Sequence, residues 1–225
     1  MNEKVLIIGA GHGLSTSIAR LFAAKGMKVG LAARNIEKLA ALADEIGAST
    51  FTCDASDPDA VVELFKAFGT DIGCPDILVY NPSSRVRGPI TEIDATATKD
   101  AILVSAYGAF LAAQQAAIRM LKAGSGTMLF TGASAGVKGY PRSASFAMGK
   151  FALRGLCQSL ARELSPQNIH VAHFVIDGHI HNKQRDEPQS DPATSLDPDD
   201  IAKSYLHIAR QNPSAWTWEI ELRPS

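Results

Sequence analysis

Residues 5–22 read VLIIGAGHGLSTSIARLF, which is an apolar run, a turn with three glycines and a segment with helical spacing. In the last part Leu14, Ile18 and Leu21 recur at intervals of three and four residues, so they would share one face of a helix. The stretch therefore predicts a buried strand, a tight turn and an amphipathic helix, which is the opening unit of a βαβ fold.

The same alternation continues along the chain, and strands that are buried on both faces read as continuous apolar runs. Helical patterns between such runs imply right-handed crossovers and a doubly wound parallel sheet with helices on both faces. A length of 225 residues suits one domain, and no boundary of a second domain is visible, so we predict a single domain over 1–225. The predicted strands are 5–8, 29–33, 49–53, 76–80, 126–130, 170–176 and 216–222.

The composition argues against several classes of protein. Lys and Arg number 22 against 23 Asp and Glu, so the basic excess of a nucleic-acid binder is missing. We find no signal peptide and no run apolar enough to span a bilayer, and the three scattered cysteines suggest neither a disulfide framework nor a metal site. We expect a protein of the cytoplasm that binds neither a metal, nor nucleic acid, nor a membrane.

Two segments interrupt the alternation. Residues 82–97 are predicted to form a loop that leads into a long helix over about 98–122, and Arg85 and Arg87 in this loop either attract an anionic substrate or are solvated charges. Residues 178–197 are polar and rich in Pro, Asp and Ser, which fits a lid-like loop over a substrate or a solvated surface loop.

The glycine turn is a candidate site for a pyrophosphate, because glycines allow close approach and a helix N-terminus attracts anions. The match to known spacings is imperfect: one form needs Gly at Leu14, and another needs Gly at Ser15. A tight turn that binds no ligand is the alternative.

The end of the second predicted strand bears on the choice of dinucleotide. An NAD site places a carboxylate there for the ribose 2′-OH, but this chain has Ala33, followed by Arg34 and Asn35. An Arg can pair with a 2′-phosphate, and His12 in the glycine turn could add charge, so NADP(H) is favoured over NAD(H). The alternative is that Arg34 is a solvated residue at a strand end.

Several motifs in a fixed order resemble the short-chain dehydrogenase/reductase family over essentially the whole chain. The resemblance implies a seven-stranded Rossmann sheet, a nicotinamide cofactor and hydride exchange between a carbonyl and an alcohol, in a homodimer or homotetramer built on two long helices. The motifs are GAGHGLS (9–15), CDASD (53–57), LVYNP (78–82), TGASAG (131–136), the helix with Lys150, and VIDGHI (175–180).

The positions that the resemblance assigns to the cofactor are largely kept. They are Gly9, Ala10, His12, Gly13 and Leu14 along the phosphates, Asp54 and Ala55 beside the adenine, Asn81 under the ribose, Lys150 on the nicotinamide ribose, and Gly178 and Ile180 beside the nicotinamide.

The positions that the resemblance assigns to the reaction are mostly changed. The family's Tyr, four residues before Lys150, falls at Phe146, which has no hydroxyl to donate. The other changes are Ser105 at the family's Asn, Ala133 at its Ser with Ser134 adjacent as a substitute, Asn182 at its Thr, and Asp177 at its Pro.

Two functions remain open from these residues. The first is an NADP(H)-dependent oxidoreductase in which Ser134 polarises the carbonyl and water, or His179 or His181, supplies the proton. The second is a catalytically silent dinucleotide-binding sensor or partner subunit. Non-redox chemistry, such as a lyase or dehalogenase reaction, ranks last, because relatives of that kind lose the glycine turn and keep the Tyr.

Overall fold

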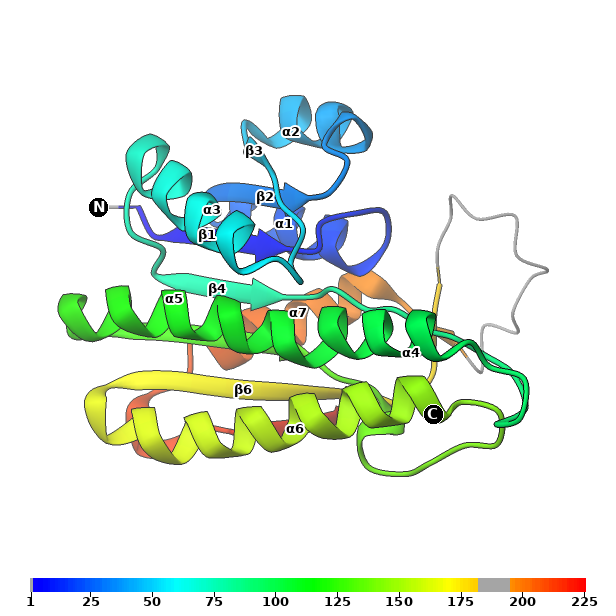
Figure 1. Cartoon of the computed structure of the whole chain (residues 1–225). Coiled ribbons are helices and arrows are strands. Elements are labelled where there is room, and N and C mark those ends of the chain that lie inside the picture. Colours follow the sequence, from blue (N-terminus) through cyan, green and yellow to red (C-terminus); the bar gives the residue numbers. More distant parts are fainter. Residues whose placement is uncertain (1, 182–194) are drawn as a thin grey trace.

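The protein is a three-layer α/β domain built on a seven-stranded parallel sheet, as the alternating pattern predicted (Figure 1). The computed structural model describes residues 2–181 and 195–225. In their order across the sheet the strands are β3 (Ser49–Thr52), β2 (Lys28–Ala33), β1 (Lys4–Ile8), β4 (Ile77–Tyr80), β5 (Gly126–Thr131), β6 (Ile169–Ile176) and β9 (Glu219–Leu222).

Helices connect the strands as crossovers and cover both faces of the sheet (Figure 1). They are α1 (Leu14–Ala24), α2 (Ala40–Ile46), α3 (Pro58–Asp71), α4 (Ala95–Ile102), α5 (Gly108–Ala123), α6 (Ala144–Leu164) and α7 (Pro198–Ala209).

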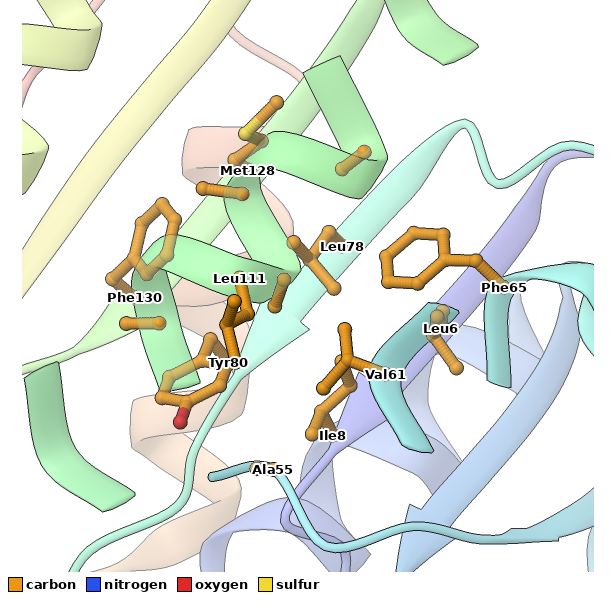
Figure 2. Close-up of a cluster of buried hydrophobic side chains, with 14 of the residues drawn as sticks. Leu6, Ile8, Ala55, Val61, Phe65, Leu78, Tyr80, Leu111, Met128 and Phe130 are labelled. Carbon is orange, nitrogen blue, oxygen red and sulfur yellow. The ribbon is translucent and has the colours of Figure 1, made fainter. Parts of the chain in front are cut away.

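The core forms two layers because side chains alternate between the faces of each strand. On β1, Leu6 and Ile8 belong to the cluster that packs under α3, α5 and α6, part of which is drawn in Figure 2. Val5 and Ile7 belong to the opposite cluster, with α1, α2 and α7. Both faces of the central strands are therefore buried, which explains why these strands read as unbroken apolar runs.

Local signals set several helix starts. Asp57 and Asp197 each accept a hydrogen bond from a first-turn amide, and Pro58 and Pro198 follow at the first helical position. Each aspartate therefore serves as the N-cap of its helix.

The long helix predicted over 98–122 extends over 95–123 and contains one π-helical turn, Leu103–Tyr107. The prediction that no run is apolar enough to span a bilayer is wrong for this helix. By length and composition alone, the helix is long and apolar enough to cross one. In the fold its small residues, such as Ala109, Ala112 and Ala116, are buried against the sheet. That packing accounts for the apolar residues on the inner side of the helix.

The polar segment 178–197 is only partly described. Its ends form two short parallel strands, β7 (His179–Ile180) and β8 (Ser195–Leu196), which the sequence did not predict. Residues 182–194, on which most of the lid prediction falls, lie outside the described residues.

Candidate functional site

The candidate residues gather at one edge of the sheet, where the parallel strands end. The strand order reverses direction between β1 and β4, and at this point doubly wound sheets bind ligands. Asn81, directly after β4, connects the ends of β4 and β1. Its backbone amide donates to the Ile8 oxygen at 2.9 Å, and its side-chain amide donates to the Gly9 oxygen at 3.5 Å.

The glycine turn after β1 depends on glycine at two positions. Gly9 has φ +79°, and a Cβ there would lie 2.5 Å from the backbone nitrogen of Pro82. Gly13 has φ +100° and precedes the first residue of α1. Gly11, by contrast, has open space where its Cβ would be, so a ligand can approach the backbone there.

Ser15 stands where one known spacing has a third glycine, and its hydroxyl holds the turn together. Its oxygen accepts from the Gly11 amide and donates to the Gly11 carbonyl, both at 2.9 Å. Thr16 adds a second hydroxyl bond to the same carbonyl. Because these hydroxyls bond to the backbone of the turn, the departure from the glycine spacing preserves its shape.

The N-terminus of α1 fits a phosphate group. No side chain caps it, and its first turn carries no acidic residue. Free amides and the positive end of the helix dipole would therefore face an anion placed above Gly11. His12 is exposed in the same turn, and Leu14 is buried beneath it.

Arg34 lies exposed at the end of β2 and has no ion-pair partner among the described residues. Its charge helps to lower the pKa of Asp54, although the main cause is hydrogen bonding of that carboxylate to Ser56. Asn35 accepts from the Glu37 amide and so shapes the following turn. Ala55 is buried beside Asp54, and Ala10 belongs to the turn itself.

Lys150 is the central charged group of the edge, and only 2% of it is exposed. Its Nζ donates to the Thr131 carbonyl at 2.7 Å and lies 5.7 Å from the centre of the Phe146 ring. Burial, with a smaller contribution from the Arg85 charge, lowers the pKa of Lys150 to about 8. Phe146 is 5% exposed and packs with Ala133 and Ala135.

Ser134 has a charged neighbour that the sequence did not reveal. The pKa of Asp177 is lowered mainly by the nearby Ser134 hydroxyl, with a further contribution from Lys138. Lys138 binds the same carboxylate at 3.1 Å. Since a hydroxyl has one proton, the Asp177 carboxylate and a substrate carbonyl would compete for the proton of Ser134.

Ser105 lies on the π-helical turn and is 1% exposed. Its hydroxyl oxygen has no hydrogen-bond partner among the described residues. The turn packs closely on α6, since a Cβ on Gly149 would lie 2.9 Å from the Cβ of Ser105. In the same turn, the Val104 carbonyl accepts from the Tyr80 hydroxyl at 2.6 Å. An unpaired buried hydroxyl beside Lys150's helix fits a bound polar ligand or water.

Gly178 and Ile180 follow β6 at the same edge, and a Cβ on Gly178 would meet Pro224 at 3.0 Å. His179 and His181 are exposed on either side of Ile180. Asn182 lies outside the described residues. No group of three or more His, Cys, Asp or Glu that could hold a metal ion occurs in 2–181 and 195–225.

A partly buried polar network at β6 and β9 was also not predicted from the sequence. Glu219 binds Arg154 through two hydrogen bonds and the His173 Nδ1 at 3.0 Å. Burial is the main cause that lowers the pKa of His173 to about 4. No spacing in the sequence links these three residues, because they meet only when β9 pairs with β6.

Comparison with known proteins supports the fold and the family. The family model of the short chain dehydrogenases matches residues 3–183. A solved short-chain dehydrogenase from Rhodopseudomonas palustris is 35% identical, with a TM-score of 0.86 and 100% of both chains covered. A metagenomic short-chain oxidoreductase solved in complex with NADP is 26% identical, with a TM-score of 0.86 and 99% and 97% covered.

A curated reductase is also similar in sequence. The chain is 30% identical over 180 residues to a 3-oxoacyl-[acyl-carrier-protein] reductase of Mycobacterium bovis, covering 80% of this chain and 70% of that protein. With a family model matched over most of its length, and a Rossmann sheet whose strand ends carry the motifs, this chain belongs to the short-chain dehydrogenase family of oxidoreductases.

Proposed function

We propose that the protein is an NADP(H)-dependent oxidoreductase that acts on a carbonyl/alcohol pair with an incomplete set of proton-transfer groups. The proposal rests on the residues that would bind the cofactor at this edge of the sheet. The N-terminus of α1 is uncapped beside the glycine turn, and Lys150 is held at the end of β5. The nicotinamide would supply the hydride.

The chain's own residues would bind and orient this cofactor. The uncapped N-terminus of α1 would bind the pyrophosphate where it passes over Gly11, and Lys150 would hydrogen-bond the nicotinamide ribose. Arg34, with Ala33 in place of a carboxylate, favours a 2′-phosphate. The NADP found in a metagenomic relative that is 26% identical agrees with this preference.

Because residue 146 is Phe, reduction of a carbonyl would need a proton from another group. A positioned general acid contributes about 10²–10⁴ in rate, whereas positioning of cofactor and substrate contributes more, so loss of a phenol need not abolish turnover. Ser105 has a buried, unpaired hydroxyl near the start of α6 that could hold a proton-delivering water.

The alternative is a catalytically silent dinucleotide-binding sensor or partner subunit. Two observations favour it: Phe146 has no hydroxyl to donate, and the Asp177 carboxylate beside Ser134 competes for the proton of that hydroxyl. It shares the cofactor site with the first proposal and differs only in turnover.

One set of measurements separates these functions. NADPH and NADH are titrated into the wild type and Arg34→Leu, and binding is followed by fluorescence. We expect the wild type to bind NADPH more tightly than NADH, and Arg34→Leu to lose this preference. A panel of ketones and aldehydes is then tested with the wild type and Phe146→Tyr. Turnover by the wild type supports the oxidoreductase, and turnover by the Tyr variant alone supports the silent binding protein. Absence of binding by either nucleotide contradicts both.

The apolar residues exposed along α5 and α6 support a homodimer or homotetramer. Both helices lie on the same face of the sheet (Figure 1), and α6 contacts the π-helical turn that precedes α5. Large side chains on their outer surfaces would be buried by a second copy. The exposed residues are Phe110, Ile118 and Leu121 on α5, Met148 and Phe151 on α6, and Tyr107 directly before α5.

A further inference from the structure

The loop after β4 is fastened to the start of α6. The Ser145 hydroxyl accepts from the Val86 amide at 3.1 Å and donates to the Val86 carbonyl at 2.8 Å. The Gly88 amide donates to the Arg142 carbonyl at 3.2 Å. These bonds fix the backbone on the C-terminal side of Arg85, so the position of Arg85 is set by the fold.

Arg85 stacks on Phe146. Its Cζ lies 3.9 Å from the centre of the ring, in the range of a cation–π contact. The side chain is exposed, and no acidic partner for it occurs in the described part of the chain. Stacking occupies one face of the guanidinium and leaves its in-plane N–H donors available to a ligand.

The surroundings of Arg85 carry an excess of positive charge. Lys150 Nζ approaches the same Phe146 ring, at 5.7 Å from its centre. Two carboxylates at this edge already have partners: Asp177 binds Lys138, and Glu219 binds Arg154 and His173. Two cations beside one ring, without a matching carboxylate, favour an anion supplied by the ligand.

We propose that Arg85 binds the carboxylate of the substrate, so that the substrate is an oxo acid whose carbonyl lies next to Phe146. This inference rests on the proposed oxidoreductase function. A planar guanidinium pairs with the two oxygens of one carboxylate, and the Phe146 ring holds that plane in a fixed orientation. The absence of a ring hydroxyl leaves Arg85 as a hydrogen-bond donor directly above residue 146.

The test uses three pairs of probes: pyruvate, acetoacetate and levulinate, each with its uncharged methyl ester, which is larger by one methyl group. Binding is measured by calorimetry in the presence of saturating NADP⁺, and kcat/KM is measured with NADPH. The proteins are the wild type, Arg85→Met, Arg85→Lys and, as matched control, Arg87→Met, which removes a neighbouring exposed charge.

We expect the wild type to bind at least one acid more tightly than its ester. Arg85→Met should lose roughly tenfold or more of its affinity for that acid and bind the ester as before, since a charged hydrogen-bonded pair is lost. Arg85→Lys should retain part of the preference, and Arg87→Met all of it.

Three outcomes overturn the inference: a wild type that binds no acid better than its ester, a preference that survives in Arg85→Met, or an equal loss in Arg87→Met. NADPH binding is measured first on each protein. If NADPH fails to bind the wild type, the proposed function itself fails; if it binds but no acid preference exists, only the oxo-acid inference fails.

Discussion

At the scale of single residues, the Asp177 carboxylate beside Ser134 competes with a substrate for the proton of that hydroxyl. In Asp177→Ala the proton of Ser134 becomes free to polarise a carbonyl, so kcat for a carbonyl substrate should rise by about tenfold, the worth of one good hydrogen bond. Steady-state kinetics with NADPH measures this.

Lys138→Ala is the control for that prediction, because the Lys138 side chain binds the same carboxylate. The bond between Lys138 and Ser134 runs from the Lys138 backbone amide to the Ser134 carbonyl, so the substitution keeps it. Its kcat should stay near the wild-type value. A similar rise in both variants would show that the loop charge, and not the freed hydroxyl, is responsible.

Lys150 makes a second residue-scale prediction, about stability. Its pKa of about 8 in the fold is below the ordinary value of 10.5, so between these pH values the unfolded chain holds the proton and the folded chain does not. Stability therefore rises with pH across this window. Compared with Lys150→Met, the wild type should gain up to about 3 kcal/mol between pH 8 and pH 10.5.

Urea unfolding of both proteins at several pH values, without nucleotide, measures this difference. Tyr and Cys side chains that titrate in the same range are common to the two proteins and cancel. A difference that stays flat from pH 7.5 to 10.5 would mean that Lys150 keeps an ordinary pKa in the fold.

At the scale of elements, the turn between β1 and α1 is predicted to tolerate a methyl group at one glycine and not at another. Gly9→Ala forces a positive φ on an L-residue and places its Cβ against the backbone of Pro82. The free energy of unfolding should fall by more than about 2 kcal/mol, and NADPH affinity should fall with it.

Gly11→Ala is the matched control, since the space at Gly11 is open. Its stability should lie within about 0.5 kcal/mol of the wild type, measured by urea unfolding. Equal destabilisation of both variants would contradict the tight approach of the turn to Pro82.

The long helix shows why element type is easier to predict than its details. Its apolar spacing predicted one helix over 98–122, but the π-helical turn at Leu103–Tyr107 carries no sequence signal of its own. That turn depends on the Tyr80 hydroxyl, which bonds the Val104 carbonyl, and on Gly149 of the neighbouring helix. Both partners come from other elements.

At the scale of the whole molecule, the proposed oligomer can be tested by charge. Phe110→Glu and Phe151→Glu place carboxylates on the exposed faces of α5 and α6. By sedimentation, the wild type should be a dimer or tetramer and each variant should shift toward monomer, because burying an unpaired carboxylate is costly.

Val137→Glu changes an exposed apolar residue outside these two helices and should leave the mass of the assembly unchanged. A wild type that sediments as a monomer at all concentrations would contradict the oligomer proposal.

The sequence by itself determined the architecture of this protein. Apolar runs separated by amphipathic helices specify a doubly wound sheet, because strands buried on both faces and crossover helices leave separate periodicities in the chain. It also placed the glycine turn and the helix of Lys150 at strand ends, since parallel strands end at the same edge.

Only the tertiary structure decided the surroundings of the candidate site at the edge of the sheet. Arg85 over Phe146, Lys138 on Asp177, and Lys150 on the Thr131 carbonyl are contacts between different loops and elements. Their geometry follows from how the ends of β4, β5 and β6 come together, and residue spacing within any one element carries no record of it. The physical reason is that periodicity encodes which face of an element is buried, whereas the partner of a polar side chain is chosen by packing across elements.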